Sequence, residues 1–173
     1  MASSINKEVS MTLRLARLPV LGAVLLAGSA LADIGPVQQQ NLSLELANRL
    51  VNATLEVCHA EGRTAVVAAV DRGGNLVALQ RDDNIGPHNT VAAQRKAFTS
   101  LSTGTASREL AERARQDPES ENLNTLDELL LLGGGVPLRS GGDLIGALGV
   151  AGAGGSAIDE GCATTAIERV LPQ

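Results

Sequence analysis

A glycine-containing turn between two short apolar segments sets the architecture of this chain. The apolar segments are residues 64–70 and 76–79, and the sequence between them is Asp71-Arg-Gly-Gly-Asn75. Short apolar runs on both sides of such a turn are typical of two strands joined as a β-hairpin. The sequence therefore predicts a sheet that is at least partly antiparallel.

Four helices are predicted around this hairpin. Ser43 is a suitable N-cap for the first helix, which an apolar stripe carries to about residue 60 and Gly62 ends. The others are expected at residues 88–101, at about 105–115 with Thr105 or Ser107 at its start, and at about 157–170. Residues 116–125 are polar and are predicted to form a mobile loop.

Three further short strands are predicted after that loop, at residues 128–132, 136–139 and 144–150. They are separated by Gly133-Gly-Gly135 and by Ser140-Gly-Gly-Asp143. The resulting order, α-β-β-α-α-β-β-β-α, is that of an α+β layered domain with a mostly antiparallel five-stranded sheet and helices packed on it.

The first 32 residues are interpreted as a secretory signal peptide. A basic start is followed by an apolar run at residues 18–30, and Ala30-Leu31-Ala32 supplies the small residues of a cleavage site. The apolar run is too short to span a bilayer as a helix. We therefore expect a periplasmic or secreted protein with a single domain at residues 33–173 and no membrane span after cleavage.

The composition argues against binding of nucleic acid. Phe98 is the chain's only aromatic residue among Phe, Tyr and Trp, and the net charge is −5. Single-stranded nucleic acid is usually bound by stacking bases on aromatic side chains. A phosphate backbone also requires a basic surface. Both features are missing from the sequence.

The two cysteines lie on the apolar stripes of the first and the last predicted helix. The first stripe is Leu44, Ala47, Val51, Leu55 and Cys58, and the last is Ile158, Cys162, Ala166 and Val170. Export permits a disulfide between them, but two buried thiols in the core are an equally open alternative. Neither cysteine has a second Cys or His at metal-ligand spacing, and the adjacent His59 points about 100° away on a helix. No metal site is predicted there, and His59 is expected to cap the helix or lie at the surface.

Several motifs together resemble one known family. They are Val70-Asp-Arg-Gly-Gly-Asn-Leu-Val, Gly86-Pro-His, Ala93-Gln-Arg-Lys-Ala97, Gly133-Gly-Gly-Val-Pro-Leu, Ile145-Gly-Ala-Leu-Gly-Val-Ala-Gly and Asp159-Glu-Gly-Cys-Ala. In this order they resemble the GlcG/HbpS family, which includes the C-terminal domain of PduO-type proteins. The resemblance covers essentially all of residues 33–173. It implies a profilin- or PAS-like α+β domain that assembles into dimers or larger rings.

The resemblance also implies a ligand. Several members of the family bind heme, some bind corrinoids, others are tied to small-molecule metabolism, and exported members are described as heme-binding. His88 follows a Gly-Pro turn at a helix start, where loops often present ligands, and it is the candidate ligand of heme iron. Arg95, seven residues on, shares its helix face and is expected to bind a propionate. Lys96 is expected to hold a second carboxylate, and Val91 and Phe98 to pack on a porphyrin edge.

The alternative without ligand binding is that His88 is a surface residue and that Arg95 and Lys96 form a solvated helix face. Gly133-Gly-Gly135 is a candidate backbone cradle for a flat ligand or a carboxylate, although a tight connection between strands is the more usual explanation of such a run. Glu160 is a possible general base, although an acid early in a helix is usually structural.

Three functions are compatible with these residues. The first is an exported heme-binding, or tetrapyrrole-binding, protein for heme capture, buffering or sensing. The second is a small enzyme that moves a proton on a small carboxylate, with Arg95 and the triple glycine holding the anion and His88 or Glu160 moving the proton. The third is a ligand-free oligomeric interaction module. No hydrolase signature is present.

A homo-oligomer of at least two subunits is expected in each case. The all-apolar run at residues 144–150, together with many Ala and Gly residues on helix faces, suits close packing between subunits.

Overall fold

A four-stranded antiparallel sheet forms the centre of the computed structural model, which describes residues 35–171. The strands are β1 (Val66–Asp71), β2 (Leu76–Arg81), β3 (Gly135–Ser140) and β4 (Asp143–Ala151), in the order β2-β1-β4-β3. The α+β class and the predicted hairpin, β1–β2, are therefore confirmed. The signal peptide predicted at residues 1–32 lies outside the described residues.

The β1–β2 turn is held together by the Asp71 carboxylate. Asp71 Oδ1 accepts hydrogen bonds from the backbone N–H groups of Gly73 and Asn75, both at 2.9 Å. Partial burial acts to raise the pKa of Asp71, but the hydrogen bonds from Asn75 and Gly73 together outweigh it and lower that pKa below its ordinary value. Gly74 has a φ of 81°, which favours glycine at this turn.

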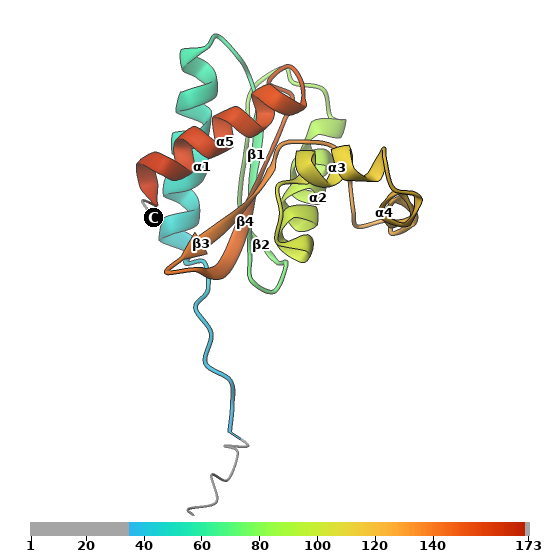
Figure 1. Cartoon of the computed structure of the whole chain (residues 1–173). Coiled ribbons are helices and arrows are strands. Elements are labelled where there is room, and N and C mark those ends of the chain that lie inside the picture. Colours follow the sequence, from blue (N-terminus) through green and yellow to red (C-terminus); the bar gives the residue numbers. More distant parts are fainter. Residues whose placement is uncertain (1–34, 172–173) are drawn as a thin grey trace, which may run out of the picture. The chain divides into compact units, whose positions relative to one another are not determined.

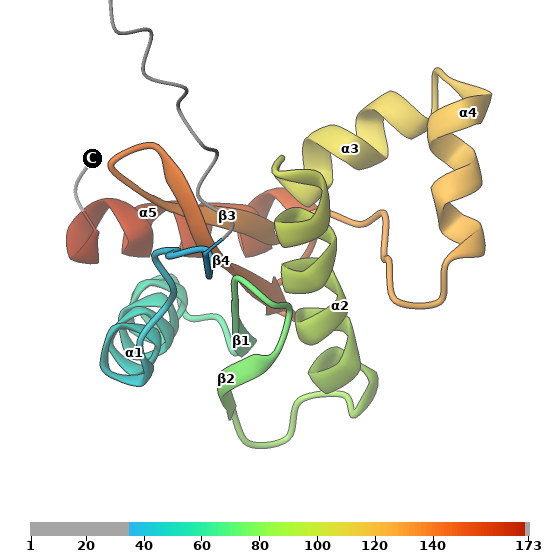
Figure 2. The ribbon, with the colours of Figure 1, turned by 90° about the horizontal axis from the view of Figure 1, so that it is seen from below.

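Helices cover both faces of the sheet (Figures 1 and 2). Helices α1 (Leu44–Ala60) and α5 (Ser156–Val170) lie together on one face, and α2 (His88–Thr103) lies on the other. Helix α3 (Ser107–Ala114) follows α2. The larger apolar core fills the space between the sheet and the α1–α5 pair, and two smaller clusters lie under α2.

Helix α1 begins and ends where the sequence predicts. Ser43 Oγ accepts the backbone N–H of Leu46 at 3.2 Å, and Gly62, with a φ of 69°, follows the end of the helix. The apolar stripe is correct except for Leu44, which is 60% exposed.

Helix α2 packs against the sheet at positions that have no side chain. A Cβ atom on Gly149 of β4 would lie 2.0 Å from the carbonyl oxygen of Ala93. A Cβ atom on Gly135 of β3 would lie equally close, at 2.0 Å, to the carbonyl oxygen of Lys96. These two glycines let the helix backbone approach the strands directly.

The fifth strand predicted at residues 128–132 is wrong. Strand β4 already pairs with β1 on one side and β3 on the other, so the sheet offers this segment no central place. Its backbone is bonded to helix side chains instead. Leu130 N–H donates to Thr99 Oγ1, Leu129 O accepts from Arg95, and Leu132 O accepts from Ser107.

The loop predicted at residues 116–125 contains helical turns. Helix α4 (Pro118–Glu121) and a 3-10 turn (Asn122–Thr125) lie within it. Asp117 caps α4 by accepting the backbone N–H groups of Glu119 and Ser120. Its pKa is lowered, first by the hydrogen bond from the Ser120 side chain and then by that from the Glu119 N–H. A capping aspartate followed by proline at the first helical position is a signal for the start of a helix. The loop prediction used only the polar character of the segment and missed this signal.

Strand β4 contains the apolar run at residues 144–150, and it lies inside the chain's own fold. It is a central strand, with α2 on one face and α5 on the other. The apolar character of this run is thus explained without a second subunit. None of the helices among residues 35–171 combines the length and the apolar character needed to cross a membrane.

Candidate functional site

A pocket of about 380 Å³ lies between the first three turns of α2 and the loop that leads from β4 into α5. Its volume falls within the range of about 300–1,000 Å³ that is common for ligand sites. The lining residues are His88, Asn89, Ala92, Lys96, Leu132, Ala151, Gly152, Gly154, Gly155, Ser156 and Asp159.

His88 stands at the entrance of this pocket. It is the first residue of α2 and its side chain is exposed. Pro87 precedes it with a φ of −60°, a value that suits the start of a helix. Asn89 Nδ2 donates to the carbonyl of Gly86 at 3.1 Å, which fixes the Gly-Pro turn below the imidazole. The turn therefore presents an accessible imidazole at a defined place.

The opposite wall of the pocket is bare backbone. Gly152, Gly154 and Gly155 have φ values of 97°, 127° and 129°, in the region that favours glycine. Gly155 is also the N-cap of α5, which has no side-chain cap. The missing side chains of Gly152 and Gly154 make room for Ile85 and Arg63, because added Cβ atoms would lie 2.5 Å from Ile85 Cδ1 and 2.9 Å from Arg63 Nη1. A Cβ atom on Gly155 would meet nothing within 4 Å, and the uncapped N–H groups that follow it at the helix start favour an anionic group.

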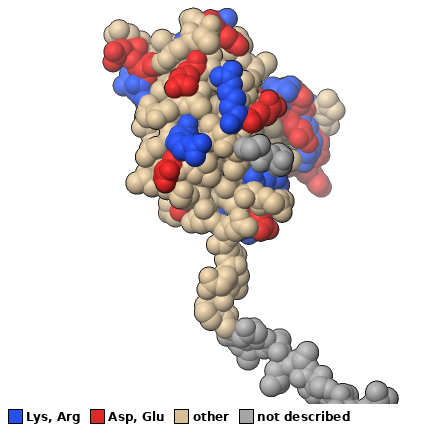
Figure 3. Space-filling model, turned by 90° about the vertical axis from the view of Figure 1, so that its left-hand side faces the viewer, with Lys and Arg blue, Asp and Glu red and all other residues tan. Residues whose placement is uncertain are grey.

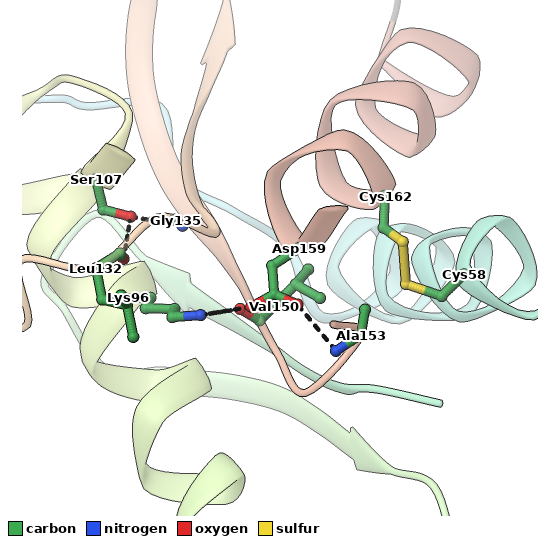
Figure 4. Close-up of polar contacts among 9 residues, drawn as sticks. All are labelled: Cys58, Lys96, Ser107, Leu132, Gly135, Val150, Ala153, Asp159 and Cys162. Carbon is green, nitrogen blue, oxygen red and sulfur yellow. Dashed lines mark hydrogen bonds and ion pairs between the residues drawn. A yellow bond between two sulfur atoms is a disulfide. The ribbon is translucent and has the colours of Figure 1, made fainter. Parts of the chain in front are cut away.

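The floor of the pocket is a buried ion pair between α2 and α5 (Figure 4). Lys96 Nζ lies 2.7 Å from Asp159 Oδ2, and the two side chains are 2% and 4% exposed. Lys96 Nζ also donates to the carbonyl of Val150 at 3.0 Å, and Asp159 Oδ1 accepts the N–H of Ala153 at 2.9 Å. The pair links α2, the end of β4, the loop at residues 152–155 (the glycine loop) and α5.

These contacts determine what Lys96 can do. The interpretation of Lys96 as part of a solvated helix face is wrong, because its ammonium is buried. The carboxylate that faces it belongs to Asp159 of the same chain. We therefore keep Lys96 out of the ligand contacts proposed below and assign it to the floor of the pocket.

Arg95 lies in a different place from His88, although both belong to α2. Arg95 lines a separate pocket with Val70, Leu76 and Phe98. Arg95 Nη2 donates to the carbonyl of Leu129 at 2.5 Å. The structure does not bring Arg95 into the pocket that His88 lines.

Gly133, Gly134 and Gly135 are buried, and their missing side chains make room for other parts of the protein. A Cβ atom on Gly134 would lie 2.4 Å from the carbonyl oxygen of Val150, and one on Gly133 would lie 2.7 Å from Cβ of Arg108. Because residues 128–132 are not a strand, the triple glycine connects that segment to β3. Close packing around Lys96 and Asp159 accounts for Gly134 and Gly135, and packing against Arg108 and Ser156 accounts for Gly133.

Glu160 lies outside the lining of the His88 pocket and is bonded to Arg108. Arg108 Nε and Nη2 donate to the two Glu160 oxygens at 3.1 and 3.0 Å. The hydrogen bonding of Arg108 to the Glu160 carboxylate is the main reason that the pKa of Arg108 lies above its ordinary value. This contact ties α3 to α5.

Cys58 and Cys162 form a disulfide, which decides between the two alternatives left open by the sequence. Their Cα atoms are 5.4 Å apart, within the usual range for a disulfide. The bond joins α1 to α5 one turn after Asp159 (Figure 4). His59, the other imidazole, is half-exposed and pairs with Asp82 at 2.9 Å.

The buried pair is the feature that the sequence analysis missed. Asp159, Cys162, Ala163 and Ala166 form one buried stripe along α5. The predicted stripe started one residue earlier, at Ile158. A charged residue at a buried stripe position requires a partner, and Lys96, between the buried Ala93 and Ala97, occupies the equivalent position on α2.

Charges of both signs are distributed over the surface. On the face shown in Figure 3, acidic and basic side chains are interspersed. This face has no extended basic area of the kind that attracts a phosphate backbone. Within residues 35–171, no three His, Cys, Asp or Glu side chains gather as a metal site.

Fold and pocket together define an α+β domain with a pocket lined by His88 and by glycines, which is the candidate ligand site. Comparison with known proteins identifies its family. The sequence profile described as "Haem degrading protein HbpS-like" matches residues 42–168, and the chain belongs to this family. The GlcG/HbpS resemblance is thereby confirmed.

Relatives support the same assignment. Protein GlcG of Escherichia coli K12 is 31% identical over 115 residues, which are 63% of this chain and 80% of GlcG. A crystal structure of HbpS is 37% identical with a TM-score of 0.73, covering 80% of this chain and 95% of HbpS. A structure of PduOC in complex with heme is 27% identical with a TM-score of 0.68, covering 76% and 96%. Heme binding is thus found among the structural relatives of this family.

Proposed function

We propose that this chain binds heme in the pocket between α2 and the glycine loop, with the His88 imidazole as the ligand of the iron. The observation that carries this proposal is an accessible imidazole on a glycine-walled pocket, in a chain similar over most of its length to PduOC, a protein solved as a heme complex. The profilin- or PAS-like layering implied by the resemblance stays a prediction.

The residues present fit a heme on chemical grounds. Imidazole is a common axial ligand of heme iron. The open backbone at Gly155 allows a flat ring to approach the wall of the pocket, and the uncapped start of α5 is suited to a carboxylate. When bound, the heme would supply the iron that the imidazole coordinates and the Soret absorption that reports binding. This chain would supply the imidazole, the flat wall and a rigid floor formed by Lys96 and Asp159.

We further propose that the protein works outside the cytoplasm, in heme capture, buffering or sensing. The leader pattern at residues 1–32 supports export, and so does the disulfide, because such bonds persist in oxidising compartments. Expression of the full chain followed by cell fractionation tests this, with the mature N-terminus at Asp33 as the expected result.

Titration of the purified protein with hemin tests the site. Wild type should give a saturable, stoichiometric change of the Soret band. His88→Ala should shift the Soret position and weaken the affinity at least tenfold, because the iron loses its protein ligand. Since His88 is exposed, the variant should keep the wild-type melting temperature.

Two control variants sharpen this experiment. His59→Ala removes the chain's other imidazole, which pairs with Asp82 away from the pocket, and should leave the spectrum unchanged. Arg95→Ala tests whether this side chain holds a propionate. Because Arg95 lies in a different pocket, we expect no change in hemin affinity. A His88→Ala protein with an unaltered heme spectrum would remove His88 from the site.

A homo-oligomer of at least two subunits remains our prediction for the protein in solution. Sedimentation velocity at tens of micromolar protein should show a species larger than the monomer, with and without hemin. Sedimentation only as a monomer at that concentration contradicts the prediction.

A further inference from the structure

The second pocket on α2 has a chemistry of its own. We propose that it binds a small zwitterionic ligand, an apolar α-amino acid, independently of the His88 pocket. Arg95 would hold the carboxylate, Glu128 the ammonium group, and the apolar walls the side chain.

The pocket lies between the β1–β2 turn and the middle of α2 and has a volume of about 210 Å³. This is below the range of about 300–1,000 Å³ typical of sites for drug-sized ligands, so a compact molecule is the better fit. The lining residues are Val70, Gly74, Leu76, Gln94, Arg95, Phe98 and Glu128.

The apolar part of the pocket is built around Phe98. A Cβ atom on Gly74 would lie 2.6 Å from Phe98 Cε2, so the glycine turn lies directly against the ring. Leu76, at the start of β2, lines the same pocket and is 48% exposed. Covering Leu76 and the free side of Phe98 with an aliphatic group would remove apolar surface from water.

Arg95 is held in place but is not saturated with acceptors. Its Nη2 is anchored on the carbonyl of Leu129, whereas its Nε is buried and has no acceptor among the described residues. Guanidinium groups bind carboxylates by charge-assisted hydrogen bonds, and Arg95 lines the pocket. A carboxylate entering the pocket would therefore meet a pre-positioned cation.

Glu128 decides which class of ligand fits. It is exposed at the same pocket, and the ion pairs among residues 35–171 do not include one between Arg95 and Glu128. A simple carboxylic acid would be attracted by Arg95 but repelled by Glu128. A zwitterion complements both charges. Gln94 donates its amide nitrogen to Thr90 O, which leaves its amide oxygen as a second acceptor for an ammonium group.

Titration with L-leucine, followed by NMR, tests the proposal. Phe98 is the chain's only Phe, Tyr or Trp, so its ring signals are free of overlap from other such rings. L-leucine should shift the Phe98 ring and the Leu76 and Val70 methyl signals in a saturable way. 4-Methylpentanoate, which lacks the ammonium, and 3-methylbutylamine, which lacks the carboxylate, should each bind at least tenfold more weakly.

Two variants assign the charges. Arg95→Gln should weaken L-leucine binding at least tenfold. Glu128→Gln should weaken L-leucine but strengthen 4-methylpentanoate, because the repulsion is removed. This reversal of preference is a readout that a merely structural role of Glu128 would not produce. No saturable shift up to about 10 mM L-leucine, or equal binding by wild type and Arg95→Gln, overturns the proposal.

The two sites can fail separately. His88→Ala should bind L-leucine like wild type, and Arg95→Gln should keep the wild-type hemin titration. If wild type does not bind hemin, the proposed heme site is refuted, but the proposal of an amino-acid site is unaffected. An L-leucine affinity that falls with His88→Ala as much as with Arg95→Gln would contradict an independent second site.

Discussion

Asp159→Ala is expected to lower the free energy of unfolding by about 3–5 kcal/mol, because it leaves the buried Lys96 ammonium without its counterion. The pair is nearly inaccessible to water, with side chains 2% and 4% exposed and a distance of 2.7 Å between Nζ and Oδ2. The substitution also removes the acceptor of the Ala153 N–H. Guanidinium chloride denaturation, with equal m-values for both proteins, measures the difference.

Glu160→Ala is the matched control for this prediction. Glu160 follows Asp159 in α5 and also accepts hydrogen bonds from a basic side chain, but its partner Arg108 is 42% exposed. Solvent screens such a pair, so the loss should be much smaller. The double variant Lys96→Met, Asp159→Asn removes both charges and keeps an oxygen for Ala153, and it should recover part of the stability. An Asp159→Ala loss no larger than that of Glu160→Ala contradicts the prediction.

Local patterns were sufficient to predict most of the fold. The hairpin around Asp71-Arg-Gly-Gly-Asn75, the cap at Ser43 and the Gly-Pro turn before α2 all depend on short-range chemistry that the sequence displays directly. The strand at residues 128–132 failed for a non-local reason. An apolar run of this length satisfies the strand pattern. Whether it joins a sheet depends on strands far away in the sequence, and β4 pairs with β1 on one edge and with β3 on the other.

The site was predicted less completely than the fold. His88 was found because a Gly-Pro turn before a helix is a local signal. The separation of Arg95 from His88 was not predictable, since helical spacing places two residues on one face but does not say which neighbouring segment covers each of them. Residues 129–132 provide that cover: Leu129 binds Arg95, and Leu132 lines the His88 pocket. Lys96 was misplaced because its partner, Asp159, lies 63 residues away.

Removal of the Cys58–Cys162 bond is expected to lower the free energy of unfolding by up to about 5 kcal/mol. The two cysteines are separated by 104 residues, so the bond closes a long loop and restricts the unfolded chain strongly. In the folded protein the bond fastens α1 to α5 within the main core, where Cys58 and Cys162 are buried among apolar side chains. Comparison of wild type with Cys58→Ala, Cys162→Ala by thermal and guanidinium chloride denaturation measures the effect.

A reductant separates the bond from the packing of the two side chains. Wild type treated with a phosphine reductant under mildly denaturing conditions should fall close to the stability of the double variant, whereas the double variant should not respond to the reductant. Cys162 belongs to α5, the helix that carries Asp159. In the reduced protein, the amide protons of α5 should therefore lose their protection from hydrogen exchange before the amide protons of β1 and β4 do. Two thiols that titrate freely in the native, oxidised protein would refute the bond, and with it this source of stability.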